Sequence, residues 1–144
     1  MQKLNAKQII IAIVAILSFA IGKTSMDYLL KGNSNTLSEK YIQAANEVNK
    51  NCPMMLDKDT RLDNTIALPN NVFQYNYTLI SFRKEEINVD QLKNDLRPSL
   101  LNNLKTNEQM NIFRTNKTTV NYYYKDKDGV FLFLIELQYE DYKS

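Results

Sequence analysis

The sequence predicts an α+β domain in which helices pack on one face of an antiparallel sheet. The chain has 144 residues, which is enough for one domain of ordinary size. Apolar residues recur at helical spacing in two segments and alternate in four others. After an N-terminal apolar segment, these segments follow the order helix-strand-strand-helix-strand-strand. Gly and Pro occur only three times each, which argues against a disordered or repetitive chain.

The N-terminal segment carries an apolar run over residues 8–22, preceded by Lys3 and Lys7. Two interpretations of this run compete, a membrane anchor and a secretory signal peptide, and a buried core helix is the third. An uncleaved membrane anchor fits the apolar character that continues beyond the run. A secretory signal peptide fits the small residues Ala20 and Gly22, with cleavage near Gly22.

The lysines before the run orient the chain, because basic residues stay on the cytoplasmic side of a membrane. We therefore expect an N-terminal membrane anchor and linker at residues 1–32 and an extracytoplasmic α+β domain at residues 33–144. The expected location is the inner membrane, crossed once, with the domain outside the cytoplasm. Export after signal cleavage is the alternative.

The first predicted helix begins at Thr36, because Thr36 and Glu39 have capping-box spacing. Pro53 ends it. Two strands are predicted at residues 60–68 and 72–82, joined by a Pro-Asn-Asn turn. The helix carries an apolar stripe at Leu37, Tyr41, Ala45, Val48 and Cys52.

The second predicted helix begins near Asn88, and Pro98 inside it predicts a kink or a restart. The last two strands, at residues 118–125 and 130–139, are joined by a hairpin turn at residues 126–129. The helix stripe is Val89, Leu92, Leu96, Leu100 and Leu104. The side chains expected to face the helices from the last strand are Phe131, Phe133, Ile135, Leu137 and Tyr139.

Charge and composition exclude several kinds of site. Residues 23–144 carry as many basic as acidic side chains, since Lys3 and Lys7 account for the small basic excess. Such a neutral domain is not expected to bind nucleic acid. The absence of histidine removes histidine-dependent catalysis, and Cys52 is the only cysteine. We therefore expect no cofactor and no metal.

A polar cluster at Asp57, Asp59, Arg61 and Asp63 is the candidate site. Carboxylates at this spacing could bind calcium or transfer protons. Neighbouring cations compensate their charge, however, so a hydrogen-bonded turn is the preferred interpretation. Cys52 lies on the apolar stripe, and we interpret it as structural. An intermolecular disulfide or a catalytic role is the alternative.

The segment from Asn49 to Leu79 resembles small uncharacterised bacterial envelope proteins with an N-terminal membrane segment. The resemblance rests on Cys-Pro-Met-Met and on Thr60-Arg61-Leu62-Asp63-Asn64-Thr65, and later on Leu96-Arg97-Pro98 and Tyr122-Tyr123-Tyr124. It implies residence in the envelope and no particular activity. It also draws attention to the polar residues Asp57, Thr60, Arg61, Asp63 and Asn64.

These observations predict a non-enzymatic, membrane-anchored envelope protein that acts as a binding or accessory module. Its partners would be the membrane, through residues 8–22, and a protein of unknown identity. Two alternatives stay open. One is an inhibitor or immunity protein that acts on an envelope enzyme, and the other is a small enzyme that uses the cluster from Asp57 to Asp63. The sequence leaves the oligomeric state open.

Overall fold

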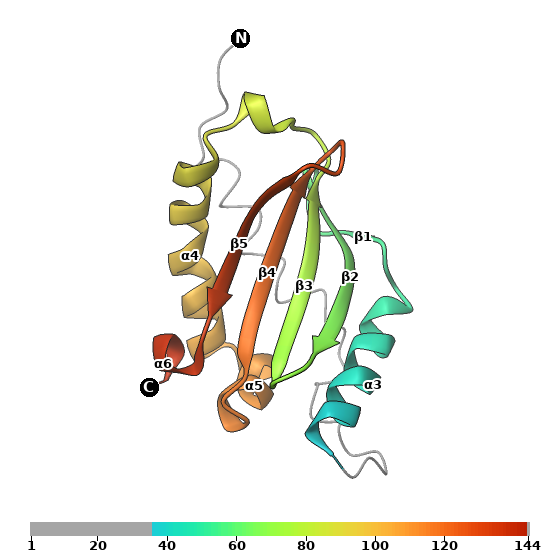
Figure 1. Cartoon of the computed structure of the whole chain (residues 1–144), viewed down its shortest axis with the longest axis vertical. Coiled ribbons are helices and arrows are strands. Elements are labelled where there is room, and N and C mark those ends of the chain that lie inside the picture. The colour runs from blue at the N-terminus through green and yellow to red at the C-terminus, as the bar shows by residue number, and fades with distance from the viewer. Residues whose placement is uncertain (1–35, 144) are drawn as a thin grey trace.

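A computed structural model describes residues 36–143, which form a five-stranded sheet with strand order β1-β2-β3-β4-β5 (Figure 1). The first half contains α3 (Leu37–Asn49), β1 (Met54–Met55), β2 (Thr60–Leu68), β3 (Val72–Leu79) and the short helix η1 (Lys84–Glu86). The second half contains α4 (Val89–Thr106), η2 (Glu108–Met110), α5 (Asn111–Thr115), β4 (Thr119–Asp126), β5 (Phe131–Leu137) and α6 (Tyr139–Tyr142).

The sheet is mixed, so the prediction of an antiparallel sheet is wrong at its centre. β2 pairs with β3, and β4 with β5, in the antiparallel sense, whereas β3 and β4 are parallel. The connection between them, residues 80–118, runs through α4 and returns the chain to the end where β3 begins. Such a crossover makes the two strands parallel. Alternation within each strand does not distinguish the two pairings.

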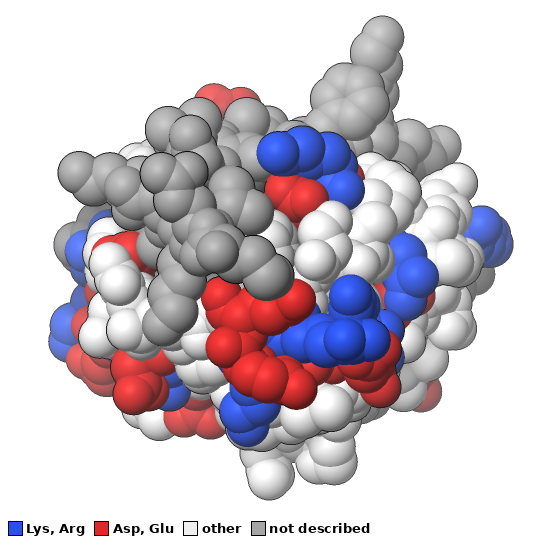
Figure 2. Space-filling model, turned by 90° about the horizontal axis from the view of Figure 1, so that it is seen from above, with Lys and Arg blue, Asp and Glu red and all other residues white. Residues whose placement is uncertain are grey.

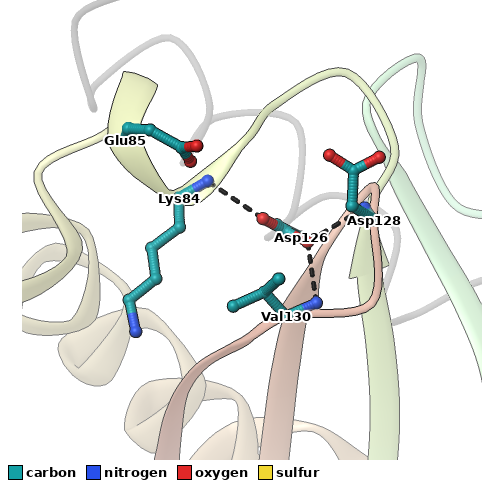
Figure 3. A pocket seen from close by; sticks show the side chains of 5 residues that line it. All are labelled: Lys84, Glu85, Asp126, Asp128 and Val130. Atoms are coloured by element: carbon teal, nitrogen blue, oxygen red, sulfur yellow. Dashed lines mark hydrogen bonds between the residues drawn. The ribbon is translucent and has the colours of Figure 1, made fainter.

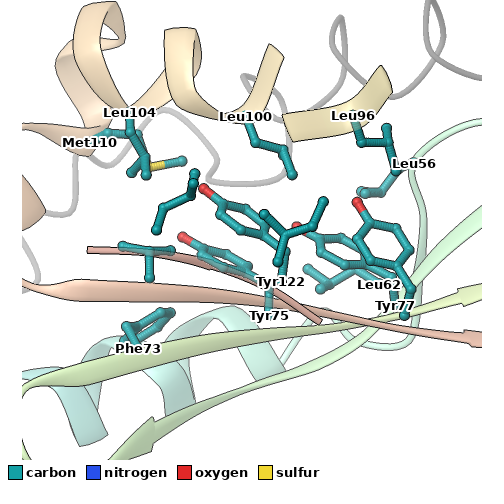
Figure 4. Packing of buried hydrophobic residues seen from close by; sticks show 14 of the residues in the cluster. Leu56, Leu62, Phe73, Tyr75, Tyr77, Leu96, Leu100, Leu104, Met110 and Tyr122 are labelled. Carbon is teal, nitrogen blue, oxygen red and sulfur yellow. The ribbon is translucent and has the colours of Figure 1, made fainter. Parts of the chain in front are cut away.

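The helices cover one face of the sheet, as predicted. The ring of Phe73 on β3 lies 5.8 Å from Tyr41 of α3 and 5.3 Å from Phe113 of α5. Tyr75 shares the face of Phe73 because it lies two residues further along the strand. Leucines of α4 lie over Tyr75 and Tyr122 (Figure 4). α3 packs mainly on β2 and α4 mainly on β5.

The first helix begins as predicted, with a capping box between Thr36 and Glu39. It ends at Asn49, before the predicted end at Cys52. The Asn49 amide donates to the Thr65 carbonyl at 2.9 Å and accepts from the Thr65 N–H at 2.7 Å. This amide occupies the outer edge of β2 beyond the short strand β1. An edge that is occupied in this way is protected from pairing with another chain.

α4 carries the predicted stripe, and its four buried leucines are Leu92, Leu96, Leu100 and Leu104. The helix does not restart at Pro98, which lies inside it on the exposed side. A proline leaves the carbonyl four residues earlier without its helical partner. That residue is Asn94, which is exposed, so water can bond its carbonyl. The stripe on the opposite side keeps the helix in place.

The last strand differs from its prediction at both ends. Its register with β4 shifts, so that Tyr124 lies opposite Phe133 and Lys125 lies opposite Phe131. Phe131 therefore points away from the helices and is 46% exposed, whereas the following residues Leu132 and Phe133 are both buried. The strand ends at Leu137, and Tyr139 begins α6 instead of extending it.

The expected anchor at residues 1–32, with its apolar run at 8–22 and the cleavage position near Gly22, lies outside the described residues. Between residues 36 and 143, none of the helices is both long enough and apolar enough to span a bilayer. The domain boundary at residue 33 stays a prediction.

Candidate functional site

The face of the sheet opposite α3, α4 and α5 is the candidate site, and no described helix packs on it. We call it the open face. Strand register determines its members, because residues that are paired across neighbouring strands point to the same side. The open face consists of Arg61, Asp63, Asn64 and Ile66 of β2, Gln74, Asn76 and Thr78 of β3, Asn121, Tyr123 and Lys125 of β4, and Phe131, Leu134 and Glu136 of β5.

A β-bulge in β2 brings two consecutive polar residues to the open face. The register between β2 and β3 shifts between Leu62 and Asn64. As a result Asp63 contacts Thr78 at 2.6 Å, while Asn64 contacts Asn76 at 2.7 Å. A regular strand would point Asp63 and Asn64 to opposite faces. Bulges often re-aim side chains in this way beside functional sites.

Asp63 is the centre of a charged group on the open face. Its carboxylate accepts from Arg61 Nε at 2.6 Å and from Thr78 Oγ1 at 2.6 Å, and Lys125 Nζ lies 3.1 Å away. Burial raises the pKa of Asp63, but hydrogen bonds from Thr78, Arg61 and Lys125 outweigh burial and lower it. The carboxylate is therefore ionised at neutral pH and is held between two cations.

Four side-chain amides form a directed chain across three strands of the open face. Asn121 Nδ2 donates to Gln74 Oε1 at 3.5 Å, and Gln74 Nε2 donates to Asn76 Oδ1 at 2.8 Å. Asn76 Nδ2 in turn donates to Asn64 Oδ1 at 2.7 Å. We call these four residues the amide chain. At one end, Asn121 Oδ1 is buried and has no hydrogen-bond partner among the described residues.

An aromatic pair borders the amide chain. The rings of Tyr123 and Phe131 lie 5.1 Å apart, and the half-buried Leu134 lies opposite Tyr123 in the register. Tyr123 also lies opposite Asn76 on the neighbouring strand. The open face thus places the exposed ring of Phe131 and the half-buried ring of Tyr123 beside its amides.

The structure separates the predicted polar cluster into two parts. Asp57 Oδ1 accepts from the backbone N–H groups of Asp59 at 2.7 Å and Thr60 at 2.8 Å, which closes the turn between β1 and β2. Asp59 lies 3.6 Å from Lys58. Arg61 and Asp63 lie on the open face instead. The four predicted residues therefore do not converge on one point.

Cys52 is half-buried, and its Sγ donates to the Val48 carbonyl at 3.6 Å. Burial, and then the negative charge of Asp63, raise the pKa of the thiol. A raised pKa disfavours the reactive thiolate. The environment of Cys52 therefore suits the structural interpretation.

A depression of about 390 Å³ lies between η1 and the β4–β5 hairpin (Figure 3). Its central carboxylate, Asp126, accepts from the backbone N–H groups of Lys84, Asp128 and Val130 at 2.8–3.0 Å. Burial raises the pKa of Asp126, but these backbone bonds outweigh burial and lower it. Asp126 thus holds the hairpin to η1.

Acidic and basic side chains lie next to one another on this end of the molecule (Figure 2), where Arg83 pairs with Asp128 at 2.9 Å. A smaller depression, of about 150 Å³, lies between the start of α3 and the β2–β3 turn. Neither depression is lined by the predicted cluster. Within residues 36–143, no group of three Cys, Asp or Glu side chains is placed to hold a metal ion.

A family model described as "Domain of unknown function (DUF8479)" matches residues 36–133. The chain belongs to this family. The DUF8479 match begins at the cap of α3 and ends inside β5, so it contains the amide chain and the aromatic pair. Among curated proteins, none matches the sequence.

The fold also occurs in a solved structure, that of a "putative secreted protein" from Pseudomonas aeruginosa. The TM-score is 0.62, the sequence identity is 10%, and the alignment covers 76% of this chain and 100% of that chain. At this identity the similarity shows a shared fold alone. This DUF8479 chain is therefore an α+β protein of a family without an assigned function.

Proposed function

We propose that this protein is a non-enzymatic binding module of the bacterial envelope, which binds its partner through the open face. The observation that carries the proposal is the asymmetry of the sheet. Three helices pack on one face, whereas the other presents amides, an aromatic pair and a compensated charged group without a described helix over them. Aromatic side chains are enriched where proteins bind partners.

The charged side chains support a binding role over a catalytic one. The Asp63 carboxylate contacts Arg61, Thr78 and Lys125, and the Asp126 carboxylate accepts from backbone N–H groups. A general acid or base needs a group that is free to exchange a proton with a substrate. The first alternative, an inhibitor or immunity protein that acts on an envelope enzyme, would be a binding module of a particular kind.

Residence in the envelope is supported by the apolar run at residues 8–22, with the lysines before it. The fold shared with a "putative secreted protein" is consistent with export. We propose that the run is an uncleaved anchor. Carbonate extraction of membranes tests it: the full-length chain should stay in the pellet. Release of a shortened chain would instead mean cleavage near Gly22.

The binding face is tested by photo-cross-linking in the native bacterium. A photoreactive residue replaces Phe131 on the open face or Ile42 on α3, which are 46% and 48% exposed. These positions are matched in exposure and differ in face. We expect adducts from position 131 and few from position 42. No adduct at position 131, or the same adducts from both positions, would contradict binding through the open face.

A further inference from the structure

We propose that the open face binds an uncharged oligosaccharide or glycan strand. The amide chain would supply hydrogen bonds to sugar hydroxyls, and Tyr123 with Phe131 would supply a flat apolar surface for the sugar ring. The inference rests on the proposed function, because it takes the open face as the binding surface, and it names the chemical class of the ligand.

The charge of the open face favours a neutral ligand. It carries two cations, Arg61 and Lys125, and two carboxylates, Asp63 and Glu136. Arg61 and Lys125 are both paired with Asp63, at 2.6 and 3.1 Å. Nucleic acids and anionic polymers bind surfaces with an excess of cations. This surface has no excess of either sign.

The amide chain matches the chemistry of hydroxyl groups. A side-chain amide presents a donor and an acceptor next to each other, and a hydroxyl both donates and accepts. Gln74, Asn76 and Asn64 are half-buried. Gln74 and Asn76 each use the oxygen and one N–H within the chain, which leaves each a second N–H and a second lone pair, whereas Asn64 uses only its oxygen there. The unpartnered Oδ1 of Asn121, a residue only 7% exposed, is the acceptor at the end of the chain.

The aromatic pair supplies the second element of recognition. Sugar rings present apolar C–H groups on their faces, which can pack on an aromatic ring. Phe131 is 46% exposed and packs on Tyr123, which lies opposite Asn76 in the register. The four strands from β2 to β5 span about 14 Å, since neighbouring strands lie about 4.8 Å apart. A short oligosaccharide can contact amides and rings together at this scale.

A protein partner fits this surface less well. The centres of protein interfaces are rich in aromatic residues, Met and Arg. Here the two middle strands of the open face, β3 and β4, carry the amides Gln74, Asn76 and Asn121 beside Tyr123, and Phe131 lies on the edge strand β5. A protein partner is therefore an outcome of the test below.

The test measures binding of the full-length chain, in a detergent without sugar groups, to chitotetraose, cellotetraose and maltotetraose by saturation-transfer NMR and calorimetry. We expect at least one of these neutral oligosaccharides to bind. Asn76→Ala and Phe131→Ala should each weaken that binding about tenfold, as expected for loss of one or two favourable contacts. Gln43→Ala, an exposed change on α3, is the matched control and should leave it unchanged.

Each other outcome overturns the inference. If none of the three sugars binds at millimolar concentration, or if heparin binds more tightly, the ligand is not a neutral glycan. If a sugar binds to Phe131→Ala and to Asn76→Ala as tightly as it binds to the unchanged chain, the open face is not its site. Circular dichroism establishes that each variant is folded. A protein adduct at position 131 without sugar binding would leave the proposed function standing and reject the glycan.

Discussion

Thr118, just before β4, joins four separate parts of the chain. Its hydroxyl bonds the Tyr41 hydroxyl of α3 and donates to Asn71 Oδ1 in the β2–β3 turn at 3.0 Å. Its carbonyl accepts from the Tyr142 hydroxyl of α6, and its N–H donates to the carbonyl of Phe113 in α5 at 3.0 Å. Thr118 is fully buried. A single side chain thus helps to fix α3 and the β2–β3 turn against the end of the sheet.

Thr118→Val tests this junction at the level of one hydroxyl. Valine preserves the shape but leaves the Tyr41 hydroxyl and Asn71 Oδ1 without their partner. We expect a loss of about 1–3 kcal/mol in the free energy of unfolding, measured by urea denaturation. Thr115→Val, at an exposed position in α5, is the control and should change it by less than about 0.5 kcal/mol. If Thr118→Val lowered the free energy of unfolding no more than Thr115→Val does, the buried hydroxyl would contribute nothing to stability.

At the scale of elements, β5 shows how a local shift in register decides which residues form the core. Phe133 is 4% exposed, and its ring lies 4.9 Å from that of Tyr124, whereas Phe131 lies on the open face. Phe133→Ala should cost about 3–5 kcal/mol of stability. Phe131→Ala should cost about 1 kcal/mol or less. Denaturant melts of both variants check the difference, and similar losses would place both rings in the core.

The same element marks the limit of prediction from the sequence. The leucine stripe of α4 and the alternation in β3 each show, within a single element, which side is buried. Both helices and the long strands were therefore predictable from the sequence. A bulge depends on how a strand pairs with its neighbour. The register shifts at Asp63 and at Leu132 therefore cannot be recognised from the alternation of apolar and polar residues along each strand. The parallel pairing of β3 with β4 was hidden for a similar reason, because it depends on the path of the crossover.

The candidate site was predictable in part. Gln74, Asn76 and Thr78 alternate in the sequence with the core side chains of the same strand, so their common face can be predicted from period-two alternation. The cluster from Asp57 to Asp63 drew attention because its residues are close in sequence. The fold places Asp57 in a turn and brings Asp63 to Lys125, a residue 62 positions later. Contacts between distant strands arise only once register is fixed.

At the scale of the whole molecule, the centre of the core is a layer of tyrosines between the sheet and α4 (Figure 4). The rings of Tyr75 and Tyr122 lie 5.6 Å apart, and those of Tyr77 and Tyr124 lie 4.9 Å apart. All four are at most 2% exposed, and their hydroxyls have no partner among the described residues. Burial raises the pKa of each tyrosine above its usual value.

This layer predicts unfolding at alkaline pH. The folded chain keeps these four phenol protons at a pH where the unfolded chain, whose tyrosines have a pKa of about 10, releases them. Their contribution to stability is therefore fully present below about pH 10 and is lost as the pH rises above it. Each tyrosine lowers the free energy of unfolding by about 1.4 kcal/mol per pH unit, so that four can cancel the stability of a typical domain within a few units.

Tyrosinate absorbance and circular dichroism, followed together from pH 9 upward, check this prediction. Since the four buried phenols ionise only in the unfolded chain, their share of the tyrosinate absorbance should appear in the same cooperative step in which the dichroism is lost. Tyr122→Phe removes one buried phenol whose hydroxyl has no described partner. It should lower the pH dependence of stability in this range by about 1.4 kcal/mol per unit. If the four phenols titrated near pH 10 while the dichroism stayed native, the tyrosine layer would be accessible to solvent, and the packing of α4 on the sheet would be wrong.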